Sequence, residues 1–292
     1  MSNTATVLAF DFGASSGRAI RAVYNGQNLT YEEIHRFENV PIEKDGHLCW
    51  DVETLLKEIH TAIQKAGTFD SLGFDTWGVD FGLLDTDGHL LANPVHYRDA
   101  RTNGKPEQAA ARMPAEELYA HTGNQIMAIN TLFQLLALRE QDPELLQKAA
   151  QILFMPDLFA ALLGAEPVCE RSIASTSQML DPRTRQWSRE VLSVYGLQEN
   201  RFAPIVASGT VTGTLANGAK IIAVAGHDTQ CASAAMPCAE EDAEHTAFLS
   251  CGTWSLLGTE LDAPILTADS CQSGLSNELG ANGKINYLKN II

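Results

Sequence analysis

The first quarter of the chain has the patterning of strands followed by one amphipathic helix. Residues 7–11 and 18–24 are apolar or alternating stretches on either side of a short turn of glycine and serine, and residues 29–37 form a third such stretch. Residues 52–66 carry apolar side chains at helical spacing, with an aspartate before them and a glycine after them, which is the usual punctuation of a helix. The pattern predicts a β-hairpin, a third strand and a helix.

The rest of the chain changes from helical back to strand patterning. Residues 71–91 predict a strand, a polar turn and a hairpin closed near an Asp-Gly pair. Residues 105–200 contain several helical segments opened by Asn, Ser, Asp-Pro or Pro. Strand patterns return at residues 220–225 and 246–257. The mixture predicts a chain of the α/β class.

A stretch rich in glycine and threonine, residues 209–218, is the candidate domain boundary. We expect a first domain over residues 1–215 and a second over residues 216–292. The second is shorter than the ~100–150 residues of an ordinary domain. Either it is a very small domain, or this chain is the N-terminal part of a longer protein; we expect the second domain to be incomplete.

The composition predicts an acidic protein with a sizeable core, since 45% of the 292 residues are apolar. The formal net charge of −16 disfavours nucleic acid and anionic membranes as partners, so an anionic ligand would need local groups: backbone amides, an arginine or Mg²⁺. The sequence shows no membrane-length apolar run, no recognisable signal peptide and no C-x-x-C pair among its six cysteines. We expect a cytoplasmic protein with reduced thiols.

Residues 11–13 and 80–82 each spell Asp-Phe-Gly, the magnesium-binding triplet of protein kinases. A protein kinase also has a glycine-rich loop, a strand lysine and a His-Arg-Asp loop before this triplet. These motifs precede neither triplet here. The sequence therefore argues against a protein kinase.

The turn after the first strand is better suited to holding a phosphate. Its residues are all small: Gly13, Ala14, Ser15, Ser16 and Gly17. Their amides and the two hydroxyls are donors that an oxyanion can approach closely. Arg18 adds a positive charge that suits phosphate, and Asp11 offers a carboxylate for Mg²⁺, directly or through water. The alternative is an ordinary hairpin turn.

Two further segments place candidate chemistry at strand ends. Asp228, between His227 and Thr229, follows a strand pattern; it would serve as general base for a substrate hydroxyl in phosphoryl transfer, while its neighbours orient a polyol. The alternative for Asp228 is to cap the helix after it. Residues 246–257 repeat the plan of the first hairpin, and Thr253 in their turn would suit terminal phosphates.

Residues 74–85 combine aromatic and carboxylate side chains in a strand–turn segment. Asp75, Trp77 and Asp80 together would suit a sugar, and Gly78 would let the backbone come close to it. The alternative is a set of strand-end residues that hydrogen-bond within the protein. The segment alone does not decide between the two interpretations.

Five segments form an ordered set along the chain: DFGASSGR, DTWGVDFGLLD, YRDARTNG, AGHDT and LSCGTWSLLG. In order and spacing this set resembles the FGGY family of carbohydrate kinases. The resemblance covers nearly the whole chain, and the set is specific although each segment alone is weak. It implies an actin-like ATPase (RNase H-like) α/β fold of two domains, with sugar and ATP meeting in the cleft between them and the second domain truncated here.

The resemblance also implies an activity: ATP- and Mg²⁺-dependent phosphorylation of a ketose, most similar to the family members that act on O1 of L-rhamnulose in L-rhamnose catabolism. It implies Asp228 as the base, with Gly78, His227 and Thr229 as sugar contacts. It implies Asp11 as the carboxylate linked to Mg²⁺. It implies ATP contacts at these positions: Ala14, Ser15, Ser16, Gly17, Arg18, Thr253 and Asn290.

The sequence also departs from the family pattern. Relatives continue well beyond residue 292 with the rest of the second domain, including the adenine pocket, and Cys251 stands where relatives often carry serine. Whether this chain is active by itself therefore stays open, as does its oligomeric state. Three alternatives also remain: a family kinase acting on fuculose or xylulose, a non-catalytic actin-like module that binds sugar or nucleotide, and an actin-like chaperone ATPase.

Overall fold

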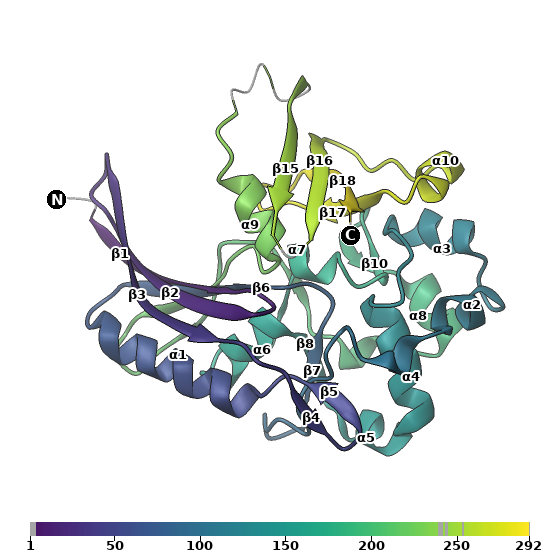
Figure 1. Ribbon diagram of the computed structural model, residues 1–292, viewed down its shortest axis with the longest axis horizontal. Coiled ribbons are helices and arrows are strands. Elements are labelled where there is room, and N and C mark those ends of the chain that lie inside the picture. The colour runs from purple at the N-terminus through teal and green to yellow at the C-terminus, as the bar shows by residue number, and fades with distance from the viewer. Residues whose placement is uncertain (1–3, 239–241, 243–244, 253, 292) are drawn as a thin grey trace.

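Two β-sheets with helices between and around them make up the fold (Figure 1). The computed structural model describes residues 4–238, 242, 245–252 and 254–291. The short helices α7 (Arg171–Ala174) and α9 (Asp228–Ala234) lie between the sheets: α9 contacts a strand of each sheet, and α7 contacts the smaller one. This mixture of strands and helices agrees with the predicted α/β class.

The larger sheet has six strands in the order β13-β14-β6-β1-β2-β3. The strands are β1 (Ala5–Phe12), β2 (Ser16–Tyr24), β3 (Leu29–Glu38), β6 (Ser71–Thr76), β13 (Thr210–Thr214) and β14 (Lys220–Ala223). β1 pairs with β2 in antiparallel and with β6 in parallel orientation, and β6 pairs in parallel with β14. The strands predicted at residues 7–11, 18–24 and 29–37 are confirmed as β1, β2 and β3.

Side chains alternate across the larger sheet and separate a packed face from an open one. Phe10 and Phe12 of β1 are fully buried, and Phe12 stacks on Phe159 of helix α6 (Met155–Leu162) with ring centroids 4.8 Å apart. Asp11 lies between the two in sequence, so its side chain points to the opposite face. The parallel register places Asp11 beside Asp75 of β6. Two carboxyl groups therefore lie side by side on the face away from the core.

Helix α1 (Val52–Ala66) has the bounds that the sequence predicts. The Asp51 carboxylate accepts a hydrogen bond of 3.2 Å from the Thr54 amide, and Gly67 follows with φ of 65°. The helix packs against β2 and β3. Its start and stop signals are local in sequence, which is why the pattern alone sufficed to predict both ends.

The middle of the chain is helix-rich, as predicted for residues 105–200. Besides α7, its helices are η1 (Ala100–Thr102), α2 (Lys105–Ala110), α3 (Ala115–Thr122), α4 (Thr131–Gln141), α5 (Pro143–Lys148), α6 (Met155–Leu162), α8 (Arg189–Tyr195) and η2 (Glu199–Arg201), and α10 (Ala268–Gln272) packs on α3 from later in the chain. Asn130 precedes α4 as predicted, but its side chain makes no capping bond and donates instead to the Gln125 carbonyl, 2.9 Å away, and to Gln178. In the described part of the chain, no helix has the length and apolar character needed to cross a membrane.

Among the described residues, short strands pair in four places outside the two sheets. The pairs are β4 (Ile42–Lys44) with β5 (His47–Cys49), β7 (Phe81–Leu84) with β8 (Gln151–Phe154), β9 (Cys169–Glu170) with β12 (Ile205–Val206), and β10 (Leu180–Asp181) with β11 (Gln186–Trp187). The hairpin predicted within residues 71–91 forms only in part. β7 pairs with β8, and it pairs with the residues after its turn only through an isolated Leu84–Leu90 bridge. All four residues of β7 are buried, which explains why a distant buried strand is its partner.

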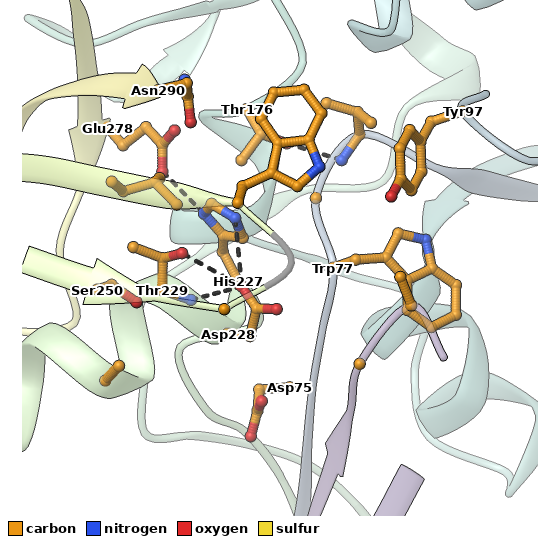
Figure 2. A pocket seen from close by; sticks show the side chains of 18 of the residues that line it. Asp75, Trp77, Tyr97, Thr176, His227, Asp228, Thr229, Ser250, Glu278 and Asn290 are labelled. Carbon is orange, nitrogen blue, oxygen red and sulfur yellow. Dashed lines mark hydrogen bonds and ion pairs between the residues drawn. The ribbon is translucent and has the colours of Figure 1, made fainter. Parts of the chain in front are cut away.

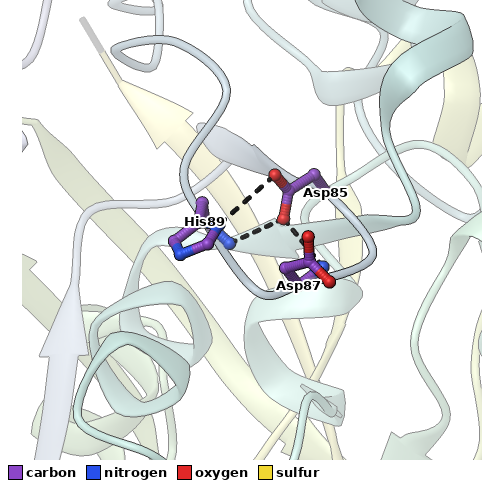
Figure 3. A group of neighbouring side chains, drawn as sticks. All are labelled: Asp85, Asp87 and His89. Atoms are coloured by element: carbon purple, nitrogen blue, oxygen red, sulfur yellow. Dashed lines mark hydrogen bonds and ion pairs between the residues drawn. The ribbon is translucent and has the colours of Figure 1, made fainter.

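The turn after β7 gathers Asp85, Asp87 and His89, whose potential metal-ligating atoms lie within 4.8 Å of one another (Figure 3). The Asp85 carboxylate accepts hydrogen bonds of 2.9 Å from the Asp87 amide and 2.8 Å from the His89 amide. The bond from the His89 amide is the main cause that lowers the pKa of Asp85. These bonds are those of a carboxylate-stabilised turn, and they account for the cluster without an ion.

The smaller sheet is antiparallel, with four strands in the order β15-β16-β18-β17. Its strands are β15 (Ala247–Cys251), β16 (Ser255–Leu261), β17 (Ser276–Leu279) and β18 (Ile285–Ile291). β15 and β16 are the second hairpin that the sequence predicts. The last residues, for which the pattern predicts no element, form β18 between β16 and β17. The domain boundary after residue 215 stays a prediction; β13 and β14 on its two sides both belong to the larger sheet.

Candidate active site

A cavity of about 590 Å³ lies between the two sheets. Its walls come from the turn after β1, the segment after β6, the segment before α9, and the strands β15 to β18 of the smaller sheet. The first three walls follow the carboxyl ends of β1, β6 and β14, which are parallel to one another. Crevices at the carboxyl ends of parallel strands are where open α/β sheets bind ligands, and the volume suits a small molecule.

Most of the site residues predicted from the sequence line this one cavity. They are Asp11, Ala14, Ser15, Ser16, Arg18, Gly78, His227, Asp228, Thr229 and Asn290. Gly17 does not line it; a Cβ atom there would lie 2.2 Å from the Phe37 ring, so its small size serves packing. Thr253 lies outside the described residues, and its neighbours Gly252 and Trp254 both line the cavity.

The turn between β1 and β2 is held from two sides. The Gly13 amide donates to the Ser16 carbonyl at 2.9 Å. Asn39 is buried; its side-chain Nδ2 donates to the Gly13 carbonyl at 2.9 Å, and its backbone N–H donates to the Ser15 carbonyl at 3.0 Å. Within the described ranges, the amides of Ala14 and Ser15 donate to no protein group. A rigid turn with unused donors at a cavity wall is suited to an anion.

Charged side chains gather beside this turn. The Arg18 guanidinium donates from Nε to Asp11 Oδ2 at 2.8 Å, across the β1–β2 ladder. Burial raises the pKa of Asp75 well above its usual range, and the neighbouring carboxylates Asp11 and Asp228 raise it further. Mutual repulsion of this kind is relieved by a cation, and carboxylate oxygens are the donors that Mg²⁺ prefers. The cavity wall therefore fits a phosphate group accompanied by a divalent cation.

The segment before α9 is anchored to both β6 and α7. The Thr76 amide donates to the Gly226 carbonyl at 2.9 Å, and the Gly226 amide donates at 3.0 Å to Glu170, a buried carboxylate that the sequence does not single out. His227 holds the N-cap position of α9, so Asp228 is its first helical residue rather than its cap. The Asp228 carboxylate accepts from the Thr229 amide at 2.6 Å and remains partly exposed toward the cavity.

Figure 2 shows the His227 ring between two carboxylates, Glu278 and Asp228. The His227 Nδ1 donates to Glu278 Oε2 at 2.8 Å, and its Nε2 lies 3.5 Å from Asp228 Oδ1. Burial by itself lowers the pKa of His227. The charge and hydrogen bond of Glu278, together with the smaller effects of the Asp228 and Asp75 charges, raise that pKa to about 9. No local motif in the sequence indicates Glu278, which comes from β17.

The aromatic wall of the cavity is positioned by Asp80, for which the structure favours hydrogen bonding within the protein over the sugar contact that the sequence also left open. Asp80 is fully buried and does not line the cavity. Its Oδ2 accepts from the indole nitrogens of Trp50 at 2.6 Å and Trp77 at 3.0 Å and from the Tyr97 amide at 3.1 Å. Burial raises the pKa of Asp80 to about 6 against these hydrogen bonds. Trp77 and Tyr97 both line the cavity, so Asp80 acts through them.

The backbone beside the aromatic wall is strained. Val79 has φ of 66°, a conformation that a β-branched residue rarely adopts. It is held there by the hydroxyl of Thr176, which accepts from the Val79 amide at 3.1 Å, and by Thr131, which donates to the Val79 carbonyl at 2.6 Å. A Cβ on Gly78 would lie 3.3 Å from Thr176 and 3.4 Å from His227 Nε2. Strain of this kind clusters at functional sites, and it leaves little room for a side chain at residue 78.

Asn124 is a further polar residue at this wall that the sequence does not indicate. It is buried and lines the cavity, and its Nδ2 donates to the Ser175 carbonyl at 2.8 Å. Its Oδ1 has no hydrogen-bond partner among the described residues. A buried acceptor without a partner is costly.

Comparison with known proteins first shows the class of fold. A solved structure of gluconate kinase from Lactobacillus acidophilus matches with a TM-score of 0.81 at 17% identity, over 98% of this chain and 59% of that chain. At this identity the likeness shows the fold alone: the actin-like (RNase H-like) α/β fold of sugar kinases, as predicted. The model of the FGGY family of carbohydrate kinases, N-terminal domain, matches residues 6–234. The chain belongs to the FGGY family of carbohydrate kinases.

Curated relatives narrow the likeness further. The chain is 42% identical to the rhamnulokinase of Bacteroides thetaiotaomicron, over 97% of this chain and 60% of the relative. It is 39% identical to the rhamnulokinase of Enterococcus faecalis, over 98% of this chain and 60% of the relative. The chain thus spans about three fifths of the length of the relatives that it matches.

Proposed function

We propose that the protein phosphorylates L-rhamnulose on O1 with ATP. One observation carries the proposal: the phosphate-sized turn after β1 and the carboxylate of Asp228 line the same cavity from different elements. A kinase needs a phosphate donor and a hydroxyl acceptor to meet at one point. The identity of 42% and 39% to two rhamnulokinases supports L-rhamnulose as the acceptor.

In this proposal the nucleotide lies against the turn of residues 14–17, with Arg18 contacting phosphate and Asn290 contacting ATP from the smaller sheet. Thr253, which lies outside the described residues, is proposed as a further ATP contact. Asn290 lines the cavity from β18, opposite the turn. Asp11 is the residue that would hold Mg²⁺, and the neighbouring carboxyl Asp75 fits this assignment. Bound Mg²⁺ would neutralise the charge on the terminal phosphates.

The ketose in this proposal lies along the other end of the cavity. Gly78, His227 and Thr229 contact it, and the faces of Trp77 and Tyr97 suit the apolar surface of a sugar. Burial raises the pKa of Asp228, and the positive charge of His227 lowers it. Asp228 accepts the proton of the O1 hydroxyl as that oxygen bonds to the γ-phosphorus of ATP and the bond to ADP breaks.

The test is ADP release with ATP, Mg²⁺ and a panel of ketoses, measured on this chain and on the longest natural form of the protein. We expect release that depends on L-rhamnulose in the long form. Preference for xylulose or fuculose would support a sugar kinase but show that its substrate is not L-rhamnulose. ATP cleavage that ignores every sugar would favour a chaperone-like ATPase, and binding without turnover in both forms would favour a non-catalytic module.

A further inference from the structure

A buried carboxylate of the smaller sheet faces the ring of His227. Glu278 in β17 is 4% exposed. Its Oε2 accepts from His227 Nδ1 and from Gln230 Nε2, each at 2.8 Å. Glu278 also lines the cavity, 51 positions from His227 in sequence. Figure 2 shows the Glu278 carboxylate beside the His227 ring, with Asp228 on the other side of the ring.

The other nitrogen of the same ring faces a second carboxylate, since His227 Nε2 lies 3.5 Å from Asp228 Oδ1. A neutral imidazole has one donor and one acceptor nitrogen, so it would turn a lone pair toward one of the two carboxylates. An imidazolium has a donor on each nitrogen and satisfies both. The arrangement of Glu278, His227 and Asp228 therefore favours the charged ring.

We propose that Glu278 is a positioning residue that keeps His227 positively charged, and that this charge keeps Asp228 ionised as the proton acceptor. The second half of the inference rests on the proposed kinase function. Glu278 acts through His227, so its role is to set the charge of the site. Gln230, the second donor to Glu278, fixes the carboxylate oxygen that faces the ring.

The charges around His227 agree with this proposal. Burial lowers the pKa of His227, and Glu278 is the first of the groups that oppose this effect; Asp228 and Asp75 follow, and together they raise the pKa to about 9. A charge that survives burial needs such close partners. Removing the charge of Glu278 would leave burial as the dominant influence on the ring.

The charges around Asp228 complete the chain of effects. Burial raises the pKa of Asp228. The positive charge of His227 lowers this pKa most strongly, and the hydrogen bonds from Thr229 lower it further, whereas the charge of Asp11 raises it. The other charged groups facing this region are Asp75, Arg18 and Glu170. A neutral His227 would thus remove the charge that most strongly opposes the effect of burial on Asp228, and the proton affinity of Asp228 would increase.

The first test is the NMR titration of the His227 ring in this chain, with its signal identified by loss in His227→Gln. We expect titration near pH 9 in the wild type and at or below the ordinary 6.5 in Glu278→Gln, because glutamine keeps an acceptor oxygen but loses the charge. Glu260→Gln is the matched control: Glu260 pairs with Lys284 in the same sheet, and we expect no effect on His227. Wild-type titration at or below 6.5 overturns the proposal even if the variant does not fold.

The second test is the pH profile of kcat/KM for ATP and L-rhamnulose in the longest natural form of the protein. In Glu278→Gln we expect the acid limb to move to higher pH by about one unit, which lowers the rate about tenfold on that limb and much less at high pH. An equal loss at all pH values would show a merely structural role and overturn the coupling to Asp228. Wild-type protein without kinase activity would overturn the proposed function and this second half, while the NMR titration decides the first half separately.

Discussion

At the residue scale, the protonation states of the cavity residues depend on neighbours from other elements. Burial raises the pKa of Asp75 well above its usual range and that of Asp80 to about 6. The carboxylate of Glu278, against the effect of burial, leads the groups that raise the pKa of His227 to about 9. Asp228 therefore has a positive ring beside it and a carboxylate that is partly exposed toward the cavity, which suits it to accept a proton.

The clearest prediction at this scale concerns Asp228→Asn. Asparagine keeps the shape and the acceptor oxygen for the Thr229 amide but accepts no proton from a substrate hydroxyl. We expect kcat to fall by ~10²–10⁴-fold, the usual contribution of a general base, with KM for the ketose within a few-fold. Steady-state kinetics on the longest natural form measure both values.

The control for this prediction is Asp85→Asn, in the turn after β7, which lies outside the cavity wall. We expect its kcat to match the wild type. Turnover of Asp228→Asn close to that of the wild type would show that another group accepts the proton.

At the scale of elements, the β1–β2 hairpin presents its turn to the cavity because its other side is packed. Gly17 of β2 pairs with Phe12 on one side and with Phe37 of β3 on the other. The Phe37 ring lies over Gly17 and meets the Phe12 ring edge-on with centroids 5.3 Å apart. The absent side chain at residue 17 leaves the space that this aromatic ring fills.

We therefore predict that Gly17→Ala destabilises the fold by about 1–3 kcal/mol, as overpacking usually does, since the new Cβ would lie 2.2 Å from the Phe37 ring. Urea unfolding measures the loss. The double variant Gly17→Ala/Phe37→Leu should recover part of the stability, because the smaller side chain can move away. Equal stability of Gly17→Ala and wild type would contradict the packing explanation and return Gly17 to a role in phosphate approach.

At the scale of the whole molecule, the two sheets are joined by polar contacts that reach the cavity. The Leu279 amide of β17 donates to Ser175 after α7 at 2.9 Å, and Glu278 accepts from His227 at the start of α9. The smaller sheet is thereby held against the segment that carries Asp228. The charge state of His227 contributes to this attachment as well as to the chemistry of the site.

Stability should consequently depend on pH through His227. Its pKa is raised from 6.5 in the unfolded chain to about 9 in the folded one, so its contribution is complete below pH 6.5 and is lost as pH rises through 9. We expect the free energy of unfolding of the wild type to fall by about 1–3 kcal/mol more than that of His227→Gln between pH 6.5 and 9. Urea titrations at several pH values measure the difference.

The control for this prediction is His60→Gln, since His60 is exposed on α1. We expect this variant to follow the pH dependence of the wild type. Parallel curves for wild type and His227→Gln would mean that the His227 ring is uncharged in the folded protein at neutral pH.

Local signals explain what could be predicted from the sequence about fold and site. The caps of α1, the glycine–serine turn and the Gly-His-Asp-Thr segment at the start of α9 each depend on residues that are close together in sequence, so the sequence indicates them directly. The sequence left the role of Asp80 open, because the same local pattern suits a ligand contact and a buried acceptor. Only the surrounding indoles of Trp50 and Trp77 distinguish the two.

The sequence by itself determined the strand and helix patterning of most of the chain, the hairpins of residues 5–24 and 247–261, and the two segments, the β1–β2 turn and the residues before α9, that supply candidate chemistry to the cavity, because these depend on periodicity, capping and short motifs. The tertiary structure alone decided which carboxylates are charged, that Gly17 serves packing, and that Glu278 faces His227. Those properties depend on side chains brought together from distant parts of the chain, where burial and nearby charge set proton affinity and neighbouring rings set the available space.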